Sequence, residues 1–246
     1  MHRFYAPQLD AARRTVVLPP DEARHLTRVL RLGPGAAVAL FDGRGREFAG
    51  RVSAAGPSGV TIEVLEPRAA APEPAVRITL AQVVLKGDKM DGVVRDAVMV
   101  GAAGIQPVVS ARAETTLATL RRAGRVERWQ RIAVASAKQC GRAVVPQVHE
   151  VSALGACASG ADVAACRLVL VEPSHARAEG IHALASGAPP AAAVVLVGPE
   201  GGWTSAETAL LETRGFRAIS LGPRTLRADA VPIVALSLLQ FAWQDL

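Results

Sequence analysis

The sequence predicts two domains: a small N-terminal β-barrel over residues 1–70 and an α/β domain with a parallel sheet over residues 74–246. Three observations support this fold class. A Pro- and Ala-rich stretch at 67–74 has little to bury and favours an extended linker. Short alternating segments separated by glycine-bearing turns precede the linker, as in a barrel. Apolar strands alternate with helical patterns after it, as in an α/β domain.

The predicted barrel contains a helix over Pro20–Leu32, which is closed by the glycines and proline at 33–35. Strands with alternating apolar residues follow, over Ala37–Phe41, Glu47–Val52 and Val60–Leu65. Turns at 42–43 and 57–59 separate these strands. Short strands joined by tight turns are typical of a small barrel.

The predicted α/β domain starts with Ile78–Leu85, a continuous apolar run that suits a buried parallel strand. Asp88 can cap the next helix. That helix places five apolar residues on one face: Met90, Val93, Val94, Ala97 and Val98. Later strands are expected over 105–109, 168–171, 193–197 and 218–221. Thr204 and Glu207 have capping-box spacing ahead of a short helix, and Pro232 sits at the start of a mostly apolar last helix.

Charge is unevenly distributed along the chain, which has 28 basic and 22 acidic residues and a formal net charge of +6. Residues 112–142 hold 8 basic and 2 acidic residues, whereas residues 161–246 hold 6 basic and 8 acidic ones. A basic middle followed by a slightly acidic end indicates a polyanion partner held by one region. A GC-rich genome that encodes Arg on solvated faces explains the same charge, since 25 of the 28 basic residues are Arg.

The most basic stretch contains a predicted helix over Arg121–Arg142. Its buried stripe is expected to comprise Val126, Trp129, Ile132, Ala133, Ala137 and Cys140. Arg125, Arg128 and Arg131 are then left on a wet face, where guanidinium groups suit the phosphate oxygens of RNA. A solvated helix face without a ligand fits the same pattern.

Several classes of protein are disfavoured by what the sequence lacks. Residues 1–10 contain no apolar segment of the secretory type, and the longest apolar run, Ala191–Val197, is too short to cross a bilayer. The three cysteines are odd in number and form no CxxC motif, which disfavours a disulfide framework or a zinc module. The five histidines show no ligand spacing. We therefore expect a cytoplasmic protein with no membrane contact and no metal.

Three turns that directly follow predicted strands form the candidate ligand site, because ligands of open α/β sheets bind beyond the carboxyl ends of the strands. The turns are Val171–Pro173, Gly198–Gly202 and Leu221–Ala230. Glycines in such turns let backbone groups approach a ligand closely. Ordinary turn chemistry explains each turn taken singly. The dinucleotide fingerprint and the Walker-type phosphate loop are both absent from the sequence, which disfavours NAD and ATP.

Motifs spread over nearly the whole chain carry a family resemblance. They are Gly198-Pro-Glu-Gly-Gly202, Leu221-Gly-Pro-Arg224 followed by Leu226-Arg227, Gln139-Cys-Gly-Arg142, Lys86-Gly-Asp-Lys89-Met90, Arg3-Phe4-Tyr5, and His25 followed by Val29-Leu30-Arg31. Together they resemble the RsmE family of SPOUT-class methyltransferases. The resemblance implies methylation of N3 of a uridine near the decoding centre of 16S rRNA, in the small ribosomal subunit.

The same resemblance implies a fold, a cofactor and an assembly. The N-terminal domain is expected to be a PUA-like β-barrel that helps to bind RNA. The C-terminal domain is expected to be a SPOUT α/β domain with a deep trefoil knot that holds S-adenosylmethionine, and the protein is expected to be a homodimer. General topology rules make a knot a rare exception, so residue patterns alone do not predict it.

Candidate site residues follow from the matching positions. The cofactor-binding candidates are Glu172, Gly198, Pro199, Glu200, Gly201, Leu221, Gly222, Leu226 and Ala230. The catalytic candidates are Arg227, to stabilise charge on the uracil, and Asp229, to orient Arg227 or accept the N3 proton. Alternatively, Arg227 forms a salt bridge that locks its loop and Asp229 caps a helix. The RNA-binding candidates are Arg3, His25, Arg28, Arg31, Lys86, Lys89, Arg112, Arg128 and Arg142.

The chain departs from the family pattern at Met99, Lys138 and Asp229, where the family has glutamate, and at Ala230, where it has threonine. Met99 is expected near the buried face of its helix. These changes leave two other functions open: a knotted methyltransferase acting on another RNA nucleotide, and an RNA-binding ribosome-assembly factor that has lost turnover. None of them lies in the 198–202 loop, so the expectation of cofactor binding is unaffected.

Overall fold

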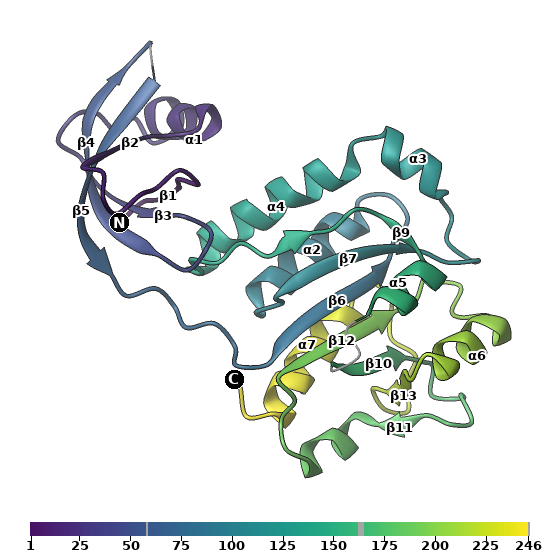
Figure 1. Cartoon of the computed structure of the whole chain (residues 1–246). Helices are drawn as coiled ribbons and strands as arrows, with labels where there is room; N and C mark the ends of the chain where they lie inside the picture. The colour runs from purple at the N-terminus through teal and green to yellow at the C-terminus, as the bar shows by residue number, and fades with distance from the viewer. Residues whose placement is uncertain (58, 162–164, 246) are drawn as a thin grey trace. The chain divides into compact units, whose positions relative to one another are not determined.

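The computed structural model describes residues 1–57, 59–161 and 165–245 (Figure 1). The chain forms two compact units, one of Met1–Glu73 with Val134–Val145 and one of Pro74–Ala133 with Pro146–Leu246. Helix α4 (Arg125–Cys140) therefore contributes residues to both units. The domain limits 1–70 and 74–246 remain a prediction.

The first unit contains a five-stranded sheet in the order β1-β3-β4-β5-β2. Its strands are β1 (Arg3–Tyr5), β2 (Thr15–Val17), β3 (Ala37–Phe41), β4 (Glu47–Gly56) and β5 (Gly59–Arg68). Strands β3, β4 and β5 lie where the sequence predicts strands, although β4 and β5 are longer. Strands β1 and β2 have three residues each, too few to show a period in the sequence. The predicted turn at 57–59 includes Ser58, which lies outside the described residues.

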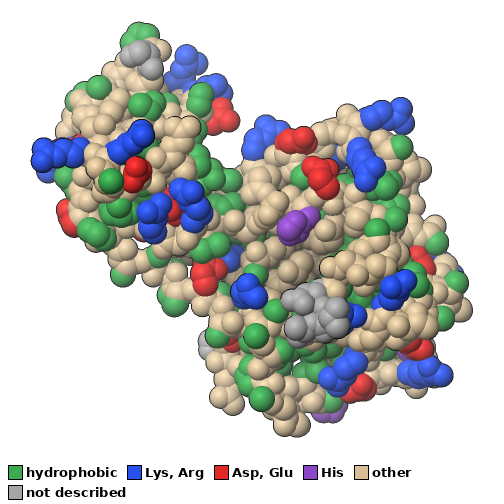
Figure 2. All heavy atoms as spheres, viewed as in Figure 1, with side chains coloured by type: hydrophobic (Ala, Val, Ile, Leu, Met, Phe, Trp, Pro, Cys, Tyr) green, Lys and Arg blue, Asp and Glu red, His purple; other side chains and the backbone are tan. Residues whose placement is uncertain are grey.

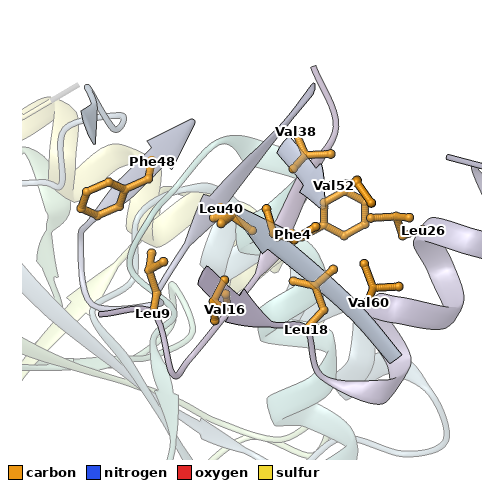
Figure 3. Close-up of a cluster of buried hydrophobic side chains, with 12 residues drawn as sticks. Phe4, Leu9, Val16, Leu18, Leu26, Val38, Leu40, Phe48, Val52 and Val60 are labelled. Atoms are coloured by element: carbon orange, nitrogen blue, oxygen red, sulfur yellow. The ribbon is translucent and has the colours of Figure 1, made fainter. Parts of the chain in front are cut away.

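An apolar core holds the first unit together (Figure 3). Its largest members, contributed by both the strands and the connecting segments, are Phe4, Leu9, Leu18, Leu26, Leu40, Phe48 and Ile62. The predicted helix over 20–32 is instead a short helix α1 (Pro20–Arg24) that continues as a π-helical turn (His25–Val29). The helical segment ends before Arg31, which has a φ of 53°. Leu26 is buried in the core, and the partly buried Ala23 of the same segment packs against it.

The second unit contains an eight-stranded sheet in the order β11-β13-β10-β12-β6-β7-β8, in which β9 also pairs with β7. Every pairing is parallel. The strands are β6 (Arg77–Val83), β7 (Gly104–Val109), β8 (Gln147–Val148), β9 (Ser152–Ala153), β10 (Cys166–Leu170), β11 (Glu179–Gly180), β12 (Ala192–Val197) and β13 (Arg217–Ser220). The predicted α/β class with a parallel sheet is confirmed.

Helices lie on both faces of the parallel sheet (Figure 1). The helical elements are α2 (Lys89–Met99), α3 (Leu117–Arg122), α4, α5 (Leu154–Gly160), a 3-10 helix (Ile181–Ser186), α6 (Ser205–Thr213) and α7 (Val231–Ala242). Residues of α5 and α6 share a buried cluster with Ala81, Val83 and Leu196 of the sheet. Helices α2 and α7 contact each other, and α7 contacts β6. In the described ranges, no helix is both long and apolar enough to span a membrane.

Local sequence signals account for several helix features. The five apolar residues predicted on one face of α2 are all buried, and the predicted capping box of Thr204 and Glu207 begins α6. Asp88 occupies the N-cap of α2 but makes no side-chain cap; it pairs instead with Arg128, at 3.4 Å. The prediction for Met99 is wrong, because its side chain is 40% exposed.

The basic helical stretch is interrupted where the sequence predicts continuous helix. Gly124 has a φ of 58°, and it separates α3 from α4, which begins at Arg125. Three residues of the predicted stripe, Trp129, Ala133 and Ala137, are buried, whereas the other three, Val126, Ile132 and Cys140, are half-buried. A left-handed glycine ends one helix and re-aims the next.

Candidate active site

Three loops meet at one edge of the parallel sheet in the second unit. They follow β10, β12 and β13, which lie side by side in the sheet, so their carboxyl ends share one edge. Together the loops surround a cavity of about 240 Å³. The three turns that the sequence singled out are therefore brought together by the order of the strands.

Seven of the nine cofactor-binding candidates line this cavity: Glu172, Gly198, Pro199, Glu200, Leu221, Gly222 and Leu226. Gly201 and Ala230 are not in its wall. Gly201 lies beside Arg112, whose Nη1 donates to its carbonyl oxygen at 2.7 Å, and Ala230 is the N-cap of α7. Sequence reasoning missed other lining residues, among them Ser174, His175, Trp203 and Thr208. Trp203 directly follows the glycine loop and could have been found there, but the other three carry no local signal.

Glu200 ties the 198–202 loop to the start of α2. Its Oε1 accepts a hydrogen bond from Lys89 Nζ at 2.8 Å. Burial by itself would raise the pKa of Glu200, but the Lys89 ammonium and the backbone amides of Glu200 and Lys86 outweigh burial and hold the pKa below its ordinary value. Glu200 is therefore a carboxylate at neutral pH, and it contributes negative charge to the cavity wall.

Two glycines allow the 198–202 loop to fold tightly around the cavity. Gly202 has a φ of 67°, and a Cβ there would lie 3.2 Å from Oε1 of Glu172. A Cβ on Gly198 would lie 3.0 Å from the Trp203 ring, whose Nε1 donates to the carbonyl oxygen of Leu170 at 2.9 Å. A larger residue at either position would therefore force the loop or the indole to shift.

Arg227 and Asp229 form a bidentate ion pair beside the cavity. Arg227 Nε donates to Asp229 Oδ1 at 3.0 Å, and Arg227 Nη2 donates to Oδ2 at 2.8 Å. This hydrogen bonding, with a smaller contribution from the charge of Lys89, lowers the pKa of Asp229. A carboxylate with a lowered pKa is a weaker base, so the geometry favours the orienting role of Asp229 over proton acceptance. The Arg227 side chain is 77% exposed and can face a substrate.

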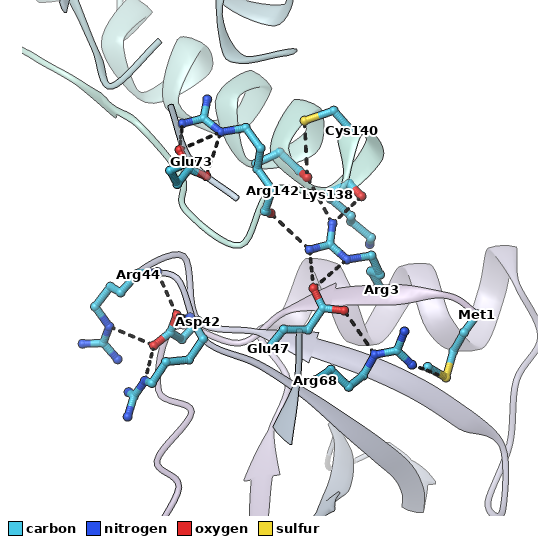
Figure 4. Close-up of polar contacts among 12 residues, drawn as sticks. Met1, Arg3, Asp42, Arg44, Glu47, Arg68, Glu73, Lys138, Cys140 and Arg142 are labelled. Atoms are coloured by element: carbon cyan, nitrogen blue, oxygen red, sulfur yellow. Dashed lines mark hydrogen bonds and ion pairs between the residues drawn. The ribbon is translucent and has the colours of Figure 1, made fainter. Parts of the chain in front are cut away.

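Two of the RNA-binding candidates lie inside the first unit (Figure 4). Arg3 pairs with the buried Glu47 at 2.7 Å and donates to the carbonyl oxygens of Ala137, Lys138 and Arg142. Arg142 is buried and forms an ion pair with Glu73. Because both guanidinium groups bond within the unit, the geometry indicates that Arg3 and Arg142 stabilise the unit and do not contact RNA.

Four further RNA-binding candidates make ion pairs or hydrogen bonds in the second unit. Lys86 pairs with Glu114, Lys89 with Glu200, and Arg128 with Asp88 and Asp91. Arg112 holds the 198–202 loop and lines the cavity. Lys89 and Arg112 are thus placed at the candidate active site.

The remaining RNA-binding candidates lie in the first unit, His25 and Arg28 in the π-helical turn and Arg31 just after it. His25 is half-buried against the Phe4 ring, with 6.3 Å between ring centroids. Arg28 and Arg31 are exposed. On the face drawn in Figure 2, Lys and Arg side chains stand singly or in small groups with Asp and Glu among them. The basic side chains on this face therefore form no continuous patch.

Two departures from the family pattern lie away from the cavity wall. Lys138 Nζ bonds to Glu22 at 2.7 Å and sits over the Phe4 ring, which makes it part of the first unit's packing. Met99 lies at the end of α2. Among the described residues, no group of three or more His, Cys, Asp or Glu side chains could hold a metal ion.

Comparison with known proteins bears on both units. Residues 72–240 match the model of an RNA methyltransferase domain, and residues 18–65 match that of an RNA methyltransferase PUA domain. The chain is 32% identical to ribosomal RNA small subunit methyltransferase E of Synechocystis sp. over 226 residues, which cover 91% of this chain and 72% of that protein. The chain belongs to the RsmE family.

Solved structures extend the match to three dimensions. The RsmE structure from Neisseria gonorrhoeae bound to S-adenosyl methionine is 34% identical, with a TM-score of 0.89 and coverage of 99% of this chain and 98% of that one. A Legionella pneumophila structure in complex with the bound cofactor SAM is 28% identical, with a TM-score of 0.88 and coverage of 98% and 97%. Both RsmE domains, the PUA domain and the methyltransferase domain, are therefore present in this chain.

Proposed function

We propose that the protein transfers a methyl group from S-adenosylmethionine to N3 of a uridine in the 16S rRNA of the small ribosomal subunit. The observation that carries the proposal is the cavity at the carboxyl edge of the parallel sheet, with Arg227 and Asp229 beside it. Relatives named as small-subunit rRNA methyltransferases match this chain over nine-tenths of its length, and their names support the choice of RNA.

The residues of the cavity fit S-adenosylmethionine. Apolar side chains such as Leu170, Val197 and Leu226 suit an adenine ring, and backbone groups of the glycine turns can bind its polar edge. Glu172 and Glu200 place carboxylates in the wall, which favours a ligand that carries positive charge. The bound cofactor supplies an electrophilic methyl group on a positively charged sulfur.

The chain's own residues would then act on the uridine. As the N3 proton passes to solvent water, negative charge develops on the uracil oxygens, and the Arg227 guanidinium can stabilise that charge. Asp229 holds the guanidinium in one orientation through two hydrogen bonds. The loops fix the positions of cofactor and base relative to each other, which lowers the entropic part of the barrier.

The trefoil knot and the homodimer belong to the same proposal. Family membership supports both. Exposed apolar side chains also support a dimer: Phe241 (75% exposed) and Leu238 (36%) lie on α7, and Met99 (40%) lies on α2, which contacts α7. Sedimentation at micromolar concentration tests it, and a monomer mass would contradict it.

Replacing Gly202 by alanine is expected to weaken S-adenosylmethionine binding by about tenfold. A left-handed conformation costs a residue with a Cβ about 1–2 kcal/mol, and 1.4 kcal/mol corresponds to tenfold in affinity. The loop can relieve the strain by leaving the cavity wall. Calorimetric titration measures the change. Gly187→Ala is the matched control, because a Cβ there meets nothing within 4 Å; equal affinities in the two variants would contradict the assignment of the loop.

RNA binding is expected to depend steeply on salt, whereas cofactor binding is not. Basic residues that contact phosphates release counterions, so RNA affinity should fall by about tenfold or more between 50 and 200 mM salt. S-adenosylmethionine is held by short-range contacts in a cavity, and its affinity should change by less than about twofold over the same range. Titrations of each ligand at several salt concentrations check this. RNA affinity that is insensitive to salt would contradict the electrostatic part of the proposal.

Nucleoside mass spectrometry of 16S rRNA from a strain that lacks the gene tests the proposal in cells. N3-methyluridine is expected to disappear from the 16S rRNA of this strain and to return when the gene is restored. Persistence of the modified nucleoside without another source enzyme would overturn the proposal. Loss of a different methylated nucleoside would support a methyltransferase with another target, and no loss would fit an assembly factor. The structure favours neither alternative, since Met99 and Lys138 lie outside the cavity wall.

A further inference from the structure

A second cavity lies at the same edge of the parallel sheet as the candidate active site. Its volume is about 140 Å³. Its wall comes from the segments that follow β6 and β7, two strands paired side by side, and from α3 and α4. The lining residues are Val84, Leu85, Lys86, Gly87, Glu114, Thr115, Leu120, Arg125 and Trp129. The methyl transfer proposed above makes no use of this cavity.

Two short chain segments separate this cavity from the active-site cavity. In the first segment, Lys86 lines the second cavity, and Lys89 bonds to Glu200 in the wall of the active-site cavity. In the other segment, Arg112 lines the active-site cavity and Glu114 lines the second one. An RNA strand whose target base reaches the active site therefore passes close to the second cavity.

The chemistry of the second cavity suits a nucleobase and its phosphate. Leu85, Leu120 and Trp129 form an apolar floor and are at most 5% exposed. Arg125 is half-buried, and its guanidinium has no hydrogen-bond or ion-pair partner in the part of the chain that the structure describes. Unstacked RNA bases bind to apolar surfaces and to guanidinium planes, and guanidinium groups also bind phosphates.

The charge around the cavity favours RNA as the occupant. Residues 112–131 contain six basic and two acidic residues. Lys86 is paired with Glu114 at 3.1 Å, but these side chains are 70% and 55% exposed, so the pair contributes little to stability. The Lys86 ammonium can exchange Glu114 for a phosphate at small cost.

We propose that this second cavity binds a nucleobase of the RNA substrate that neighbours the target nucleotide, with Arg125 contacting that base or its phosphate. The proposal rests on the proposed function, because it requires RNA to be the substrate. It assigns part of the recognition of the sequence around the target to residues outside the cofactor loops.

Three variants test the proposal. Thr115→Trp fills the cavity without changing the charge, Arg125→Ala removes the unpaired guanidinium, and Arg121→Ala is the control, an exposed arginine of α3 that lines neither cavity. The probe is the unmodified small ribosomal subunit, for which Kd and KM are measured together with the Kd for S-adenosylmethionine. Thr115→Trp and Arg125→Ala are expected to raise the Kd and KM for the subunit by about tenfold, and Arg121→Ala by less than about twofold. Cofactor affinity should be unchanged in all three.

Equal weakening of subunit binding by Arg125→Ala and Arg121→Ala would overturn the proposal, because it would show a general charge effect. Wild-type binding by a folded Thr115→Trp would overturn it as well. If Thr115→Trp also loses its affinity for S-adenosylmethionine, the substitution has disturbed the fold. The comparison of the two arginine variants then decides the question. Failure of the wild-type protein to methylate rRNA overturns the proposed function instead, so the two failures are distinguishable.

Discussion

Arg227→Ala is expected to lower the rate of methyl transfer by about 10²- to 10³-fold at saturating concentrations of both substrates. Removal of one group that stabilises developing charge has an effect of this size in other enzymes. The side chain is 77% exposed, and its bonds in the structure are those to Asp229. The variant should therefore keep its fold and its affinity for S-adenosylmethionine. Single-turnover measurements of methyl transfer give the rate without interference from product release.

Two companion variants separate the roles of the ion pair. Asp229→Asn leaves Arg227 in place but weakens the two hydrogen bonds that orient it. The rate of methyl transfer is expected to fall by about tenfold, less than for Arg227→Ala. An equal fall in both variants would point to Asp229 as a proton acceptor after all. Arg214→Ala removes an exposed arginine at the end of α6 and should leave the rate unchanged. An Arg227→Ala enzyme that keeps more than a tenth of the wild-type rate would remove the role assigned to Arg227.

Arg3→Ala is expected to destabilise the first unit by about 3 kcal/mol, as is typical when one partner of a buried ion pair is removed. Glu47 is 7% exposed, and its remaining ion pair among the described residues would be the longer one with Arg68, at 3.4 Å. Three backbone carbonyl groups would also lose a donor. Urea unfolding followed by circular dichroism measures the change in the free energy of unfolding.

The control for this prediction is Arg51→Ala, which removes an exposed arginine from β4 and should change stability by less than about 0.5 kcal/mol. Cofactor affinity should be normal in both variants, since the cavity belongs to the second unit. If Arg3→Ala is as stable as the wild type but binds RNA less tightly, the result would support the RNA-binding role that the sequence predicts for Arg3.

Local patterns in the sequence predict the parts of the fold that depend on neighbouring residues. The buried face of α2 follows from spacing, and the start of α6 follows from Thr204 and Glu207. The three cofactor turns could be chosen because each follows an apolar strand, and the parallel sheet then brings them together. Strands β1 and β2 were not predicted, because a strand of three residues is too short to show an alternating pattern of apolar residues.

The roles of charged residues could not be predicted from spacing, because their partners are distant in the sequence. Arg3 bonds to residues more than 130 positions away, and Lys89 to a residue 111 positions away. A basic residue in a motif is equally compatible with a phosphate contact and with an internal ion pair. The folded structure decides between them. Arg3 and Arg142 bond to groups of the first unit, and Lys89 bonds to Glu200 at the candidate active site.

Methyl transfer in a purified system tests the proposed function directly. The protein is incubated with S-adenosylmethionine that carries an isotope-labelled methyl group and with small ribosomal subunits from a strain that lacks the modification. The rRNA is then digested to nucleosides for mass spectrometry. The proposed function predicts labelled N3-methyluridine at one position of 16S rRNA. Absence of label from the rRNA, or label confined to another nucleoside, would contradict it.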